Sequence, residues 1–317
     1  MQEIQVRSTV SDVASRMTAP MTHAILGAGG VGGTIGACLA HLGDSVTLVV
    51  RPEALAQYPR ALHFESTLGN FDVNVFVAAE VPPVDVLWIA VKATQLEAAL
   101  TATKNPGAVR AIVPLLNGVD HVALLRSKYG AERVIPATIA AEMERTASGQ
   151  IVVRGPLPVL SISSARRSLL DSTLAQLQKL GFGGRFVDDE PTLLWSKLVF
   201  LAPSGLSTTA ADKPIGGILS DPEWRRLAEG CVREACAVGV AEGATVDAEK
   251  VLAVMMKMPP NGRSSMQKDV DHHNPPELDA IAGPILRGGQ KHGIDVPATK
   301  KLVTLVEQRA GVAKIVA

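Results

Sequence analysis

Short apolar runs alternate with helix-like patterns over the first half of the chain. Apolar residues recur at helical spacing in segments 31–42, 95–102 and 119–128. Strand-sized apolar runs lie at 23–27, 46–50, 86–91, 111–116 and 134–140. Strands that are apolar along their whole length are typical of a parallel sheet covered on both faces. The alternation therefore predicts a Rossmann-type parallel sheet with helices packed on it.

The pattern changes near residue 190. Helical periodicity marks segments 193–201, 224–240, 248–256 and 277–292, with few strand-like runs between them. We therefore expect an α/β chain with a Rossmann-type domain at 21–189 and a mostly α-helical domain at 190–317. The boundary is placed between Asp188 and Pro191, where acidic residues and a proline separate the two patterns. Residues 1–20 are interpreted as a polar N-terminal extension without an assigned function.

Composition excludes several functional classes. Basic and acidic residues number 31 each, so no net charge attracts the chain to nucleic acid or to an anionic membrane. The apolar runs are too short for a membrane span, and a secretory signal is not recognisable. Cys38, Cys231 and Cys236 lack the close pairing of a zinc site, and adjacent histidines such as His272 and His273 rarely point to one centre. We expect a cytoplasmic protein with reduced cysteines and no bound metal.

A glycine-rich turn follows the first predicted strand. Gly27, Gly29 and Gly32 fit the pattern G-x-G-x-x-G, and Gly30 and Val31 lie inside it. In this strand-turn-helix context the glycines permit a tight turn, close approach of a pyrophosphate and close helix packing. The helix N-terminus would attract the phosphates. The turn therefore predicts dinucleotide binding, with a loop that serves packing alone as the alternative.

The end of the second predicted strand indicates which dinucleotide would bind. An acidic side chain there would hold a ribose 2′-hydroxyl, whereas an arginine would hold a 2′-phosphate. Arg51 occupies that place, and Glu53 lies two residues further on. We therefore favour NADP(H) over NAD(H), although Arg51 could instead be an ordinary surface charge.

Several motifs in a fixed order resemble the ketopantoate reductase (2-dehydropantoate 2-reductase) family, from residue 23 almost to the carboxyl terminus. They are GAGGVG at 27–32, VVR at 49–51, AVKATQ at 90–95, LLNGV at 115–119, LWSKL at 194–198, SSMQKD at 264–269 and PELDAIAG at 276–283. The resemblance implies NADPH-dependent reduction of 2-dehydropantoate to pantoate, a step of pantothenate and coenzyme A biosynthesis.

The resemblance also implies roles for single residues. Lys92 would contact the cofactor, and Asn117 would lie near both the nicotinamide ribose and the substrate. Lys197 would be the general acid that protonates the developing alkoxide. Glu277 would accept a hydrogen bond from a substrate hydroxyl or orient the lysine, and Ser265 would donate to the substrate carboxylate.

Each of these residues also has a purely structural interpretation. Lys92 could face solvent, Asn117 could belong to a turn, and Lys197 could extend its charge to the surface. Ser265 could cap a helix, and Glu277 could be a first-turn charge that favours the helix dipole.

The chain departs from the family pattern after Lys197. The family usually carries asparagines four and eight residues after the lysine, where this chain has Leu201 and Gly205. Because amide partners for a polar substrate are lost, a branched or more apolar 2-keto acid is an alternative substrate.

Two further functional classes and the oligomeric state stay open. Related two-domain dehydrogenases of opines or sugar acids usually rely on a histidine, and we expect none near Lys197. A non-catalytic NADP-binding sensor is the other alternative, although it would not need a proton donor. A homodimer is compatible with the sequence, but Met255, Met256 and Met258 are more simply interpreted as core residues.

Overall fold

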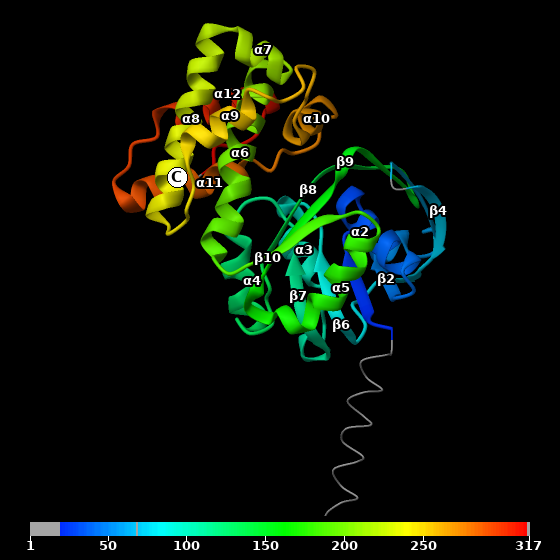
Figure 1. The fold of residues 1–317 in the computed structure, drawn as a ribbon. Coiled ribbons are helices and arrows are strands. Elements are labelled where there is room, and N and C mark those ends of the chain that lie inside the picture. The colour runs from blue at the N-terminus through cyan, green and yellow to red at the C-terminus, as the bar shows by residue number, and fades with distance from the viewer. Residues whose placement is uncertain (1–19, 68, 316–317) are drawn as a thin grey trace, which may run out of the picture.

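The computed structural model describes residues 20–67 and 69–315, so residues 1–19 of the predicted extension lie outside the described part. The sheet-containing part comes first in the chain, and the helical part packs against it through α6 (Figure 1). Among the described residues, no helix has both the length and the apolar character needed to cross a bilayer.

The first sheet has five parallel strands in the order β5-β2-β1-β6-β7. The strands are β1 (Thr22–Leu26), β2 (Ser45–Val49), β5 (Phe76–Ala78), β6 (Val84–Ile89) and β7 (Val109–Pro114). Helix α2 (Gly30–His41) joins β1 to β2, α3 (Leu96–Leu100) joins β6 to β7, and α4 (His121–Tyr129) follows β7. The strand order reverses at β1, which makes the carboxyl edge beside it the expected ligand site. The predicted parallel sheet is confirmed.

A second sheet, which the apolar pattern does not predict, has the order β10-β9-β3-β4, with β8 also paired to β9. Its strands are β3 (Ala61–Ser66), β4 (Gly69–Asn74), β8 (Ala137–Ala147), β9 (Gln150–Ser163) and β10 (Gly183–Val187), and α5 (Arg167–Lys179) joins β9 to β10. The strand predicted at 134–140 is only partly right. Val134 bridges Ile112 in parallel, but β8 begins at Ala137 and runs antiparallel to β9.

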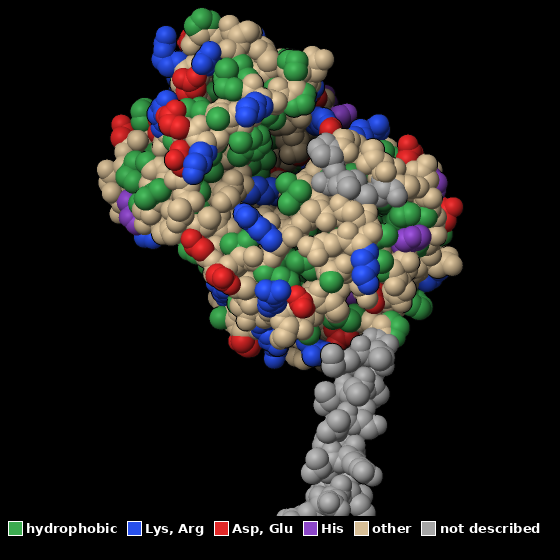
Figure 2. Space-filling view, viewed as in Figure 1, with side chains coloured by type: hydrophobic (Ala, Val, Ile, Leu, Met, Phe, Trp, Pro, Cys, Tyr) green, Lys and Arg blue, Asp and Glu red, His purple; other side chains and the backbone are tan. Residues whose placement is uncertain are grey.

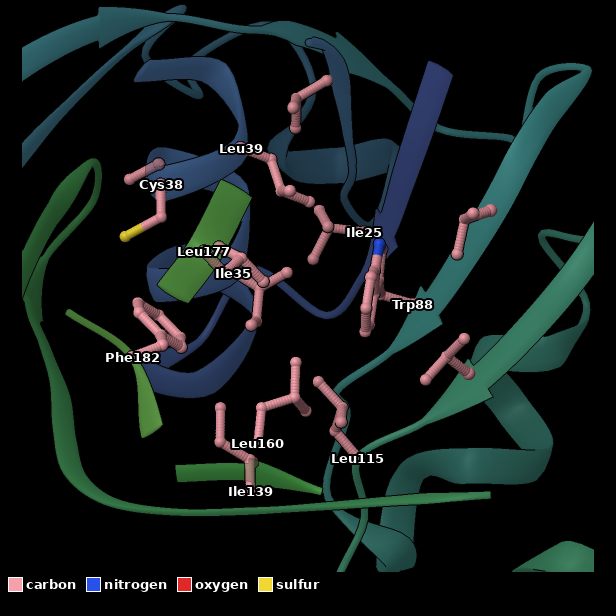
Figure 3. Packing of buried hydrophobic residues seen from close by; sticks show 14 of the residues in the cluster. Ile25, Ile35, Cys38, Leu39, Trp88, Leu115, Ile139, Leu160, Leu177 and Phe182 are labelled. Atoms are coloured by element: carbon pink, nitrogen blue, oxygen red, sulfur yellow. The ribbon is translucent and has the colours of Figure 1, made fainter. Parts of the chain in front are cut away.

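Helix α2 lies between the two sheets and shares one buried cluster with both. Ile35 of α2 belongs to this cluster together with Ile25 and Trp88 of the first sheet and Ile139 of the second (Figure 3). Cys38 is buried there too, and burial raises the pKa of its thiol to about 12. The cluster fixes the N-terminus of α2 against the carboxyl edge of the first sheet.

The helical part is built around α6 (Glu190–Ala211), which packs against α8, α10 and α12. The other helices are α7 (Ile215–Ser220), α8 (Pro222–Ala241), α9 (Ala248–Met255), α10 (Ser265–Asp271), α11 (Leu278–His292) and α12 (Pro297–Ala310). The predicted fold class, a Rossmann-type α/β domain followed by a mostly helical one, is confirmed. Division into domains between residues 189 and 190 stays a prediction.

The three methionines near the end of α9 do not share one environment. Met255 is buried and Met258 is partly buried against the helical core, as expected. The expectation of a core residue is wrong for Met256, which is 48% exposed because α9 buries only the other side of its last turn. A homodimer stays a prediction.

Candidate active site

The glycine-rich turn leaves open space at the N-terminus of α2. Gly27 has a φ of +103°, a conformation that favours glycine. Gly29 is the N-cap of α2, whose first N–H groups receive no side-chain cap. A Cβ atom added to Gly29 would meet no atom within 4 Å. The turn therefore presents free backbone donors to open space, as a bound phosphate requires.

Arg51 follows β2 at the same edge of the sheet. Its side chain is 85% exposed, and its Nε lies 3.6 Å from Oε1 of Glu53, which is 69% exposed. An exposed pair at this separation contributes little to stability. The guanidinium therefore remains available to a ligand.

Lys92 is not a free surface lysine. Its Nζ lies 2.5 Å from Oδ1 of Asp269 in α10, so it connects the sheet-containing part to the helical part. Sequence reasoning did not assign a role to Asp269, although it ends the SSMQKD motif. A phosphate that binds Lys92 would have to share the ammonium with this carboxylate.

Glu277 and Asn117 meet across the two parts of the chain. The carboxylate of Glu277 is 8% exposed and accepts hydrogen bonds from the backbone N–H of Ala93, at 2.7 Å, and from Nδ2 of Asn117, at 2.9 Å. Glu277 precedes α11, but its side chain makes no helix-capping bond. The side chain therefore binds the segments that follow β6 and β7 instead of capping α11.

Gly118 explains why the turn after Asn117 needs glycine. Its φ is +84°, and a Cβ atom there would lie 2.1 Å from the backbone oxygen of Ala280 in α11. Nearby, Arg287 of α11 donates to Asp120 at 2.6 Å and to Asp279 at 2.7 Å. The turn is thus part of the contact that places α11 against the first sheet.

Gly118→Ala should lower the free energy of unfolding by more than the positive φ of Gly118 alone explains, because the added methyl group would overlap Ala280. A matched control is Gly293→Ala, because Gly293 also has positive φ, but a Cβ atom added to it would meet nothing within 4 Å. The additional cost at Gly118 should be about 1–3 kcal/mol, as is typical of overpacking. Urea unfolding of both variants measures this difference, and equal midpoints would contradict the close contact.

Lys197 of α6 lies close enough to Glu277 for the charges of the two side chains to interact. Burial lowers the pKa of its ammonium to about 8, and the negative charge of Glu277 opposes that shift. In the described part of the chain the ammonium has no hydrogen-bond or ion-pair partner. A lysine that titrates close to neutral pH and has no partner is suited to exchange a proton with a ligand.

The expectation that no histidine lies near Lys197 is wrong. His121, the first residue of α4, is 7% exposed, and neither ring nitrogen has a hydrogen-bond partner among the described residues. Burial, together with the positive charge of Lys197, lowers the pKa of His121 to about 4. The imidazole is therefore neutral near pH 7. Sequence reasoning missed it because 76 residues separate two side chains that only the fold brings together.

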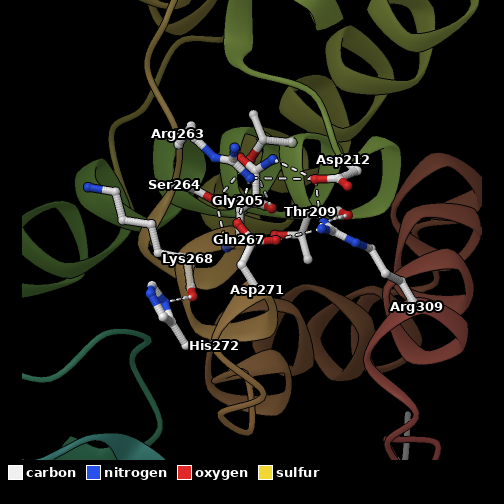
Figure 4. Close-up of polar contacts among 11 residues, drawn as sticks. Gly205, Thr209, Asp212, Arg263, Ser264, Gln267, Lys268, Asp271, His272 and Arg309 are labelled. Carbon is white, nitrogen blue, oxygen red and sulfur yellow. Dashed lines mark hydrogen bonds and ion pairs between the residues drawn. The ribbon is translucent and has the colours of Figure 1, made fainter.

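Ser265 is exposed at the start of α10, and its hydroxyl has no partner among the described residues. Ser264 caps the helix instead, because its Oγ accepts from the backbone N–H of Gln267 at 3.1 Å. Thr208 of α6 donates to the same oxygen at 2.8 Å. Gln267 donates to Asp212 at the end of α6, and Arg309 of α12 donates to both Thr209 of α6 and Asp271 of α10 (Figure 4). Ser265 is therefore held in place with its hydroxyl free.

The two positions that depart from the family pattern differ in their surroundings. Leu201 packs partly buried against the helical core. Gly205 is buried, yet a Cβ atom added to it would meet nothing within 4 Å. The space that a larger side chain would occupy at Gly205 is therefore left open.

Comparison with known proteins gives a consistent result over most of the chain. Family models described as "Ketopantoate reductase PanE/ApbA" and "Ketopantoate reductase PanE/ApbA C terminal" match residues 23–165 and 192–310. A 2-dehydropantoate 2-reductase from Caulobacter vibrioides is 33% identical over 301 residues, which cover 90% of this chain and 98% of the relative.

Solved structures agree with this relationship. A PanE/ApbA family ketopantoate reductase from Ralstonia eutropha superposes with a TM-score of 0.81 at 26% identity, over 92% of this chain and 99% of that one. A D-mandelate dehydrogenase solved with NADH and anilino(oxo)acetate has the same TM-score and coverage at 21% identity, which shows a shared fold. The two family models together, and the Caulobacter relative by itself, cover both the sheet-containing and the helical part. The chain is therefore an oxidoreductase that belongs to the ketopantoate reductase family.

Proposed function

We propose that this protein reduces a 2-keto acid with NADPH, that 2-dehydropantoate is its substrate, and that Lys197 is the general acid. The observation that carries the proposal is the hydrogen bond between Asn117 and Glu277 at the carboxyl edge of the first sheet, together with the charge interaction between Glu277 and Lys197. The product, pantoate, belongs to pantothenate and coenzyme A biosynthesis.

The residues present fit a dinucleotide. The open space at Gly29 and the uncapped N-terminus of α2 suit a pyrophosphate. The exposed guanidinium of Arg51 suits a 2′-phosphate, and Lys92 adds a second positive charge. When bound, NADPH would supply the hydride for the keto carbon.

The residues of the chain supply the remaining parts of the reaction. As the keto carbon is reduced, negative charge develops on its oxygen, and the Lys197 ammonium stabilises that charge and donates the proton that completes the alcohol. The charge of Glu277 raises the pKa of the ammonium and so favours its protonated form at neutral pH. Asn117 and Ser265 hold the substrate, with the serine hydroxyl donating to its carboxylate. Solvent then returns a proton to Lys197.

Arg51→Ala tests the choice of cofactor. Loss of the guanidinium should raise the KM for NADPH about tenfold, which corresponds to about 1.4 kcal/mol, and leave the KM for NADH nearly unchanged. Arg60→Ala, at another exposed arginine, is the control. Equal effects of Arg51→Ala on both cofactors would contradict recognition of a 2′-phosphate.

The reaction is tested by following the loss of NADPH absorbance with 2-dehydropantoate and a panel of other 2-keto acids. Turnover of 2-dehydropantoate supports the proposal. Turnover restricted to more apolar keto acids supports the second candidate, which the open space at Gly205 and the apolar Leu201 favour. Tight NADPH binding without any turnover supports a sensor and contradicts both.

A further inference from the structure

A cavity of about 380 Å³ lies where the second sheet meets α6 and α9. This volume falls in the range of small-molecule sites. Lys197 lines the cavity, whereas Asn117, Glu277 and Ser265 are not among its described lining residues. The space thus adjoins the candidate active site without being formed by the residues assigned to the substrate. Figure 2 shows lysine and arginine side chains on this face where the two parts of the molecule meet.

Three polar side chains form a row across the sheet wall of the cavity. Thr138 of β8 and Arg185 of β10 are both in register with Ser161 of β9, which lies between them. Register partners on one face of a sheet lie about 5 Å apart. All three line the cavity, and none has a side-chain hydrogen bond or ion pair within the described part of the chain. Two hydroxyls and a guanidinium are therefore available to one ligand.

The charge of the cavity selects an anion. Arg185, Lys197 and Lys250 line it, and no acidic residue is among its described lining residues. Lys250, at the start of α9, also lacks an ion-pair partner among the described residues. Positive groups gathered in a cleft raise the local concentration of anions. A carboxylate matches both the guanidinium and the hydroxyl donors.

The remaining wall is apolar. Phe200 of α6 and Val251 and Val254 of α9 face the polar row across the cavity, and Val159 adjoins the row on β9. Val159 is 48% exposed and Val254 is 56% exposed, so both leave apolar surface open to solvent. A ligand with an apolar body would cover this surface, which favours binding.

We propose that this cavity binds an organic carboxylate with an apolar body. The carboxylate lies on the row of Thr138, Ser161 and Arg185, and the body lies against Phe200 and Val254. Two sources of this chemistry exist: the 2-keto acid substrate itself, whose carboxylate would then lie on this row instead of on Ser265, or a second molecule that binds beside the substrate. The proposal goes beyond the proposed reaction and does not depend on it.

Calorimetric titration of the full chain with 3-phenylpropionate, which has no keto group, tests the site without turnover. We expect one molecule to bind per chain. Arg185→Gln should weaken binding at least tenfold, because a charge-assisted hydrogen bond is lost. Ala140→Leu, which extends an exposed lining side chain into the cavity, should weaken it to a similar extent.

Matched controls separate the cavity from the rest of the surface. Arg226→Gln and Ala253→Leu make the same changes at exposed positions that do not line the cavity, and should leave binding unchanged. Absence of binding, or equal binding by all four variants, would overturn the proposal.

Kinetics with the keto acid that the enzyme reduces then distinguish the two sources. If 3-phenylpropionate raises only the KM for that keto acid, the substrate itself occupies the cavity. If it changes kcat without competing, a second molecule does. Because the calorimetric result stands without catalysis, failure of the reductase assay would not be confused with failure of this site.

Discussion

Replacing Lys197 by alanine is expected to lower kcat for 2-keto acid reduction by about 10²–10⁴-fold, the usual contribution of a general acid. Burial lowers the pKa of this ammonium to about 8, which keeps it mostly protonated at pH 7 yet able to release its proton. Steady-state kinetics at pH 7 measure the effect. The KM for NADPH should change little, because the cofactor is assigned to other residues.

The control for this variant is Lys213→Ala. Lys213 follows α6 and pairs with Asp221, outside the candidate site, so its loss should leave kcat unchanged. Circular dichroism and NADPH binding show whether Lys197→Ala retains its fold. A folded Lys197→Ala protein with normal kcat would exclude the lysine as the proton donor.

Glu277→Gln should both lower kcat and change its pH dependence. In the native protein the rate of reduction should be constant below pH 8 and fall about tenfold per pH unit above it, because the proton donor must be charged. Glu277 raises the pKa of Lys197, so loss of its charge should lower that pKa and move the decline to lower pH. We expect kcat at pH 7 to fall at least tenfold, since the hydrogen bonds of Ala93 and Asn117 are also disturbed.

Glu307→Gln provides a matched control, because Glu307 of α12 is as buried as Glu277 but accepts its hydrogen bond from the backbone N–H of Ile315. It should not move the pH profile. If Glu277→Gln shifted the decline to higher pH or left it in place, the coupling between the carboxylate and the lysine would be refuted.

The first sheet could be predicted from the sequence because its strands are buried on both faces. Segments 46–50 and 86–91 are apolar throughout, and that pattern is local. The second sheet could not, because β3 and β8 alternate polar and apolar residues and keep one face accessible. Its pairing is also non-local: His63 of β3 is in register with Gln150 of β9. Only long-range contacts decide such pairing.

The candidate site was predicted in part for a similar reason. Motifs name Asn117, Lys197 and Glu277, but only the fold shows that Asn117 and Glu277 are hydrogen-bonded across 160 residues of sequence. His121 and Arg185 belong to none of the motifs. Only the structure shows that the buried ring nitrogens of His121 lack partners and that Arg185 lines the cavity. Such a property is absent from the sequence pattern.

Transfer of deuterium from NADPH to the substrate tests the central claim most directly. The protein is mixed with 2-dehydropantoate and NADPH that carries deuterium at the transferred position of C4, and the product is analysed by mass spectrometry. The account predicts pantoate with one deuterium at C2, formed at a much lower rate by Lys197→Ala. NADPH binding without deuterium transfer to 2-dehydropantoate or to any other 2-keto acid would contradict it.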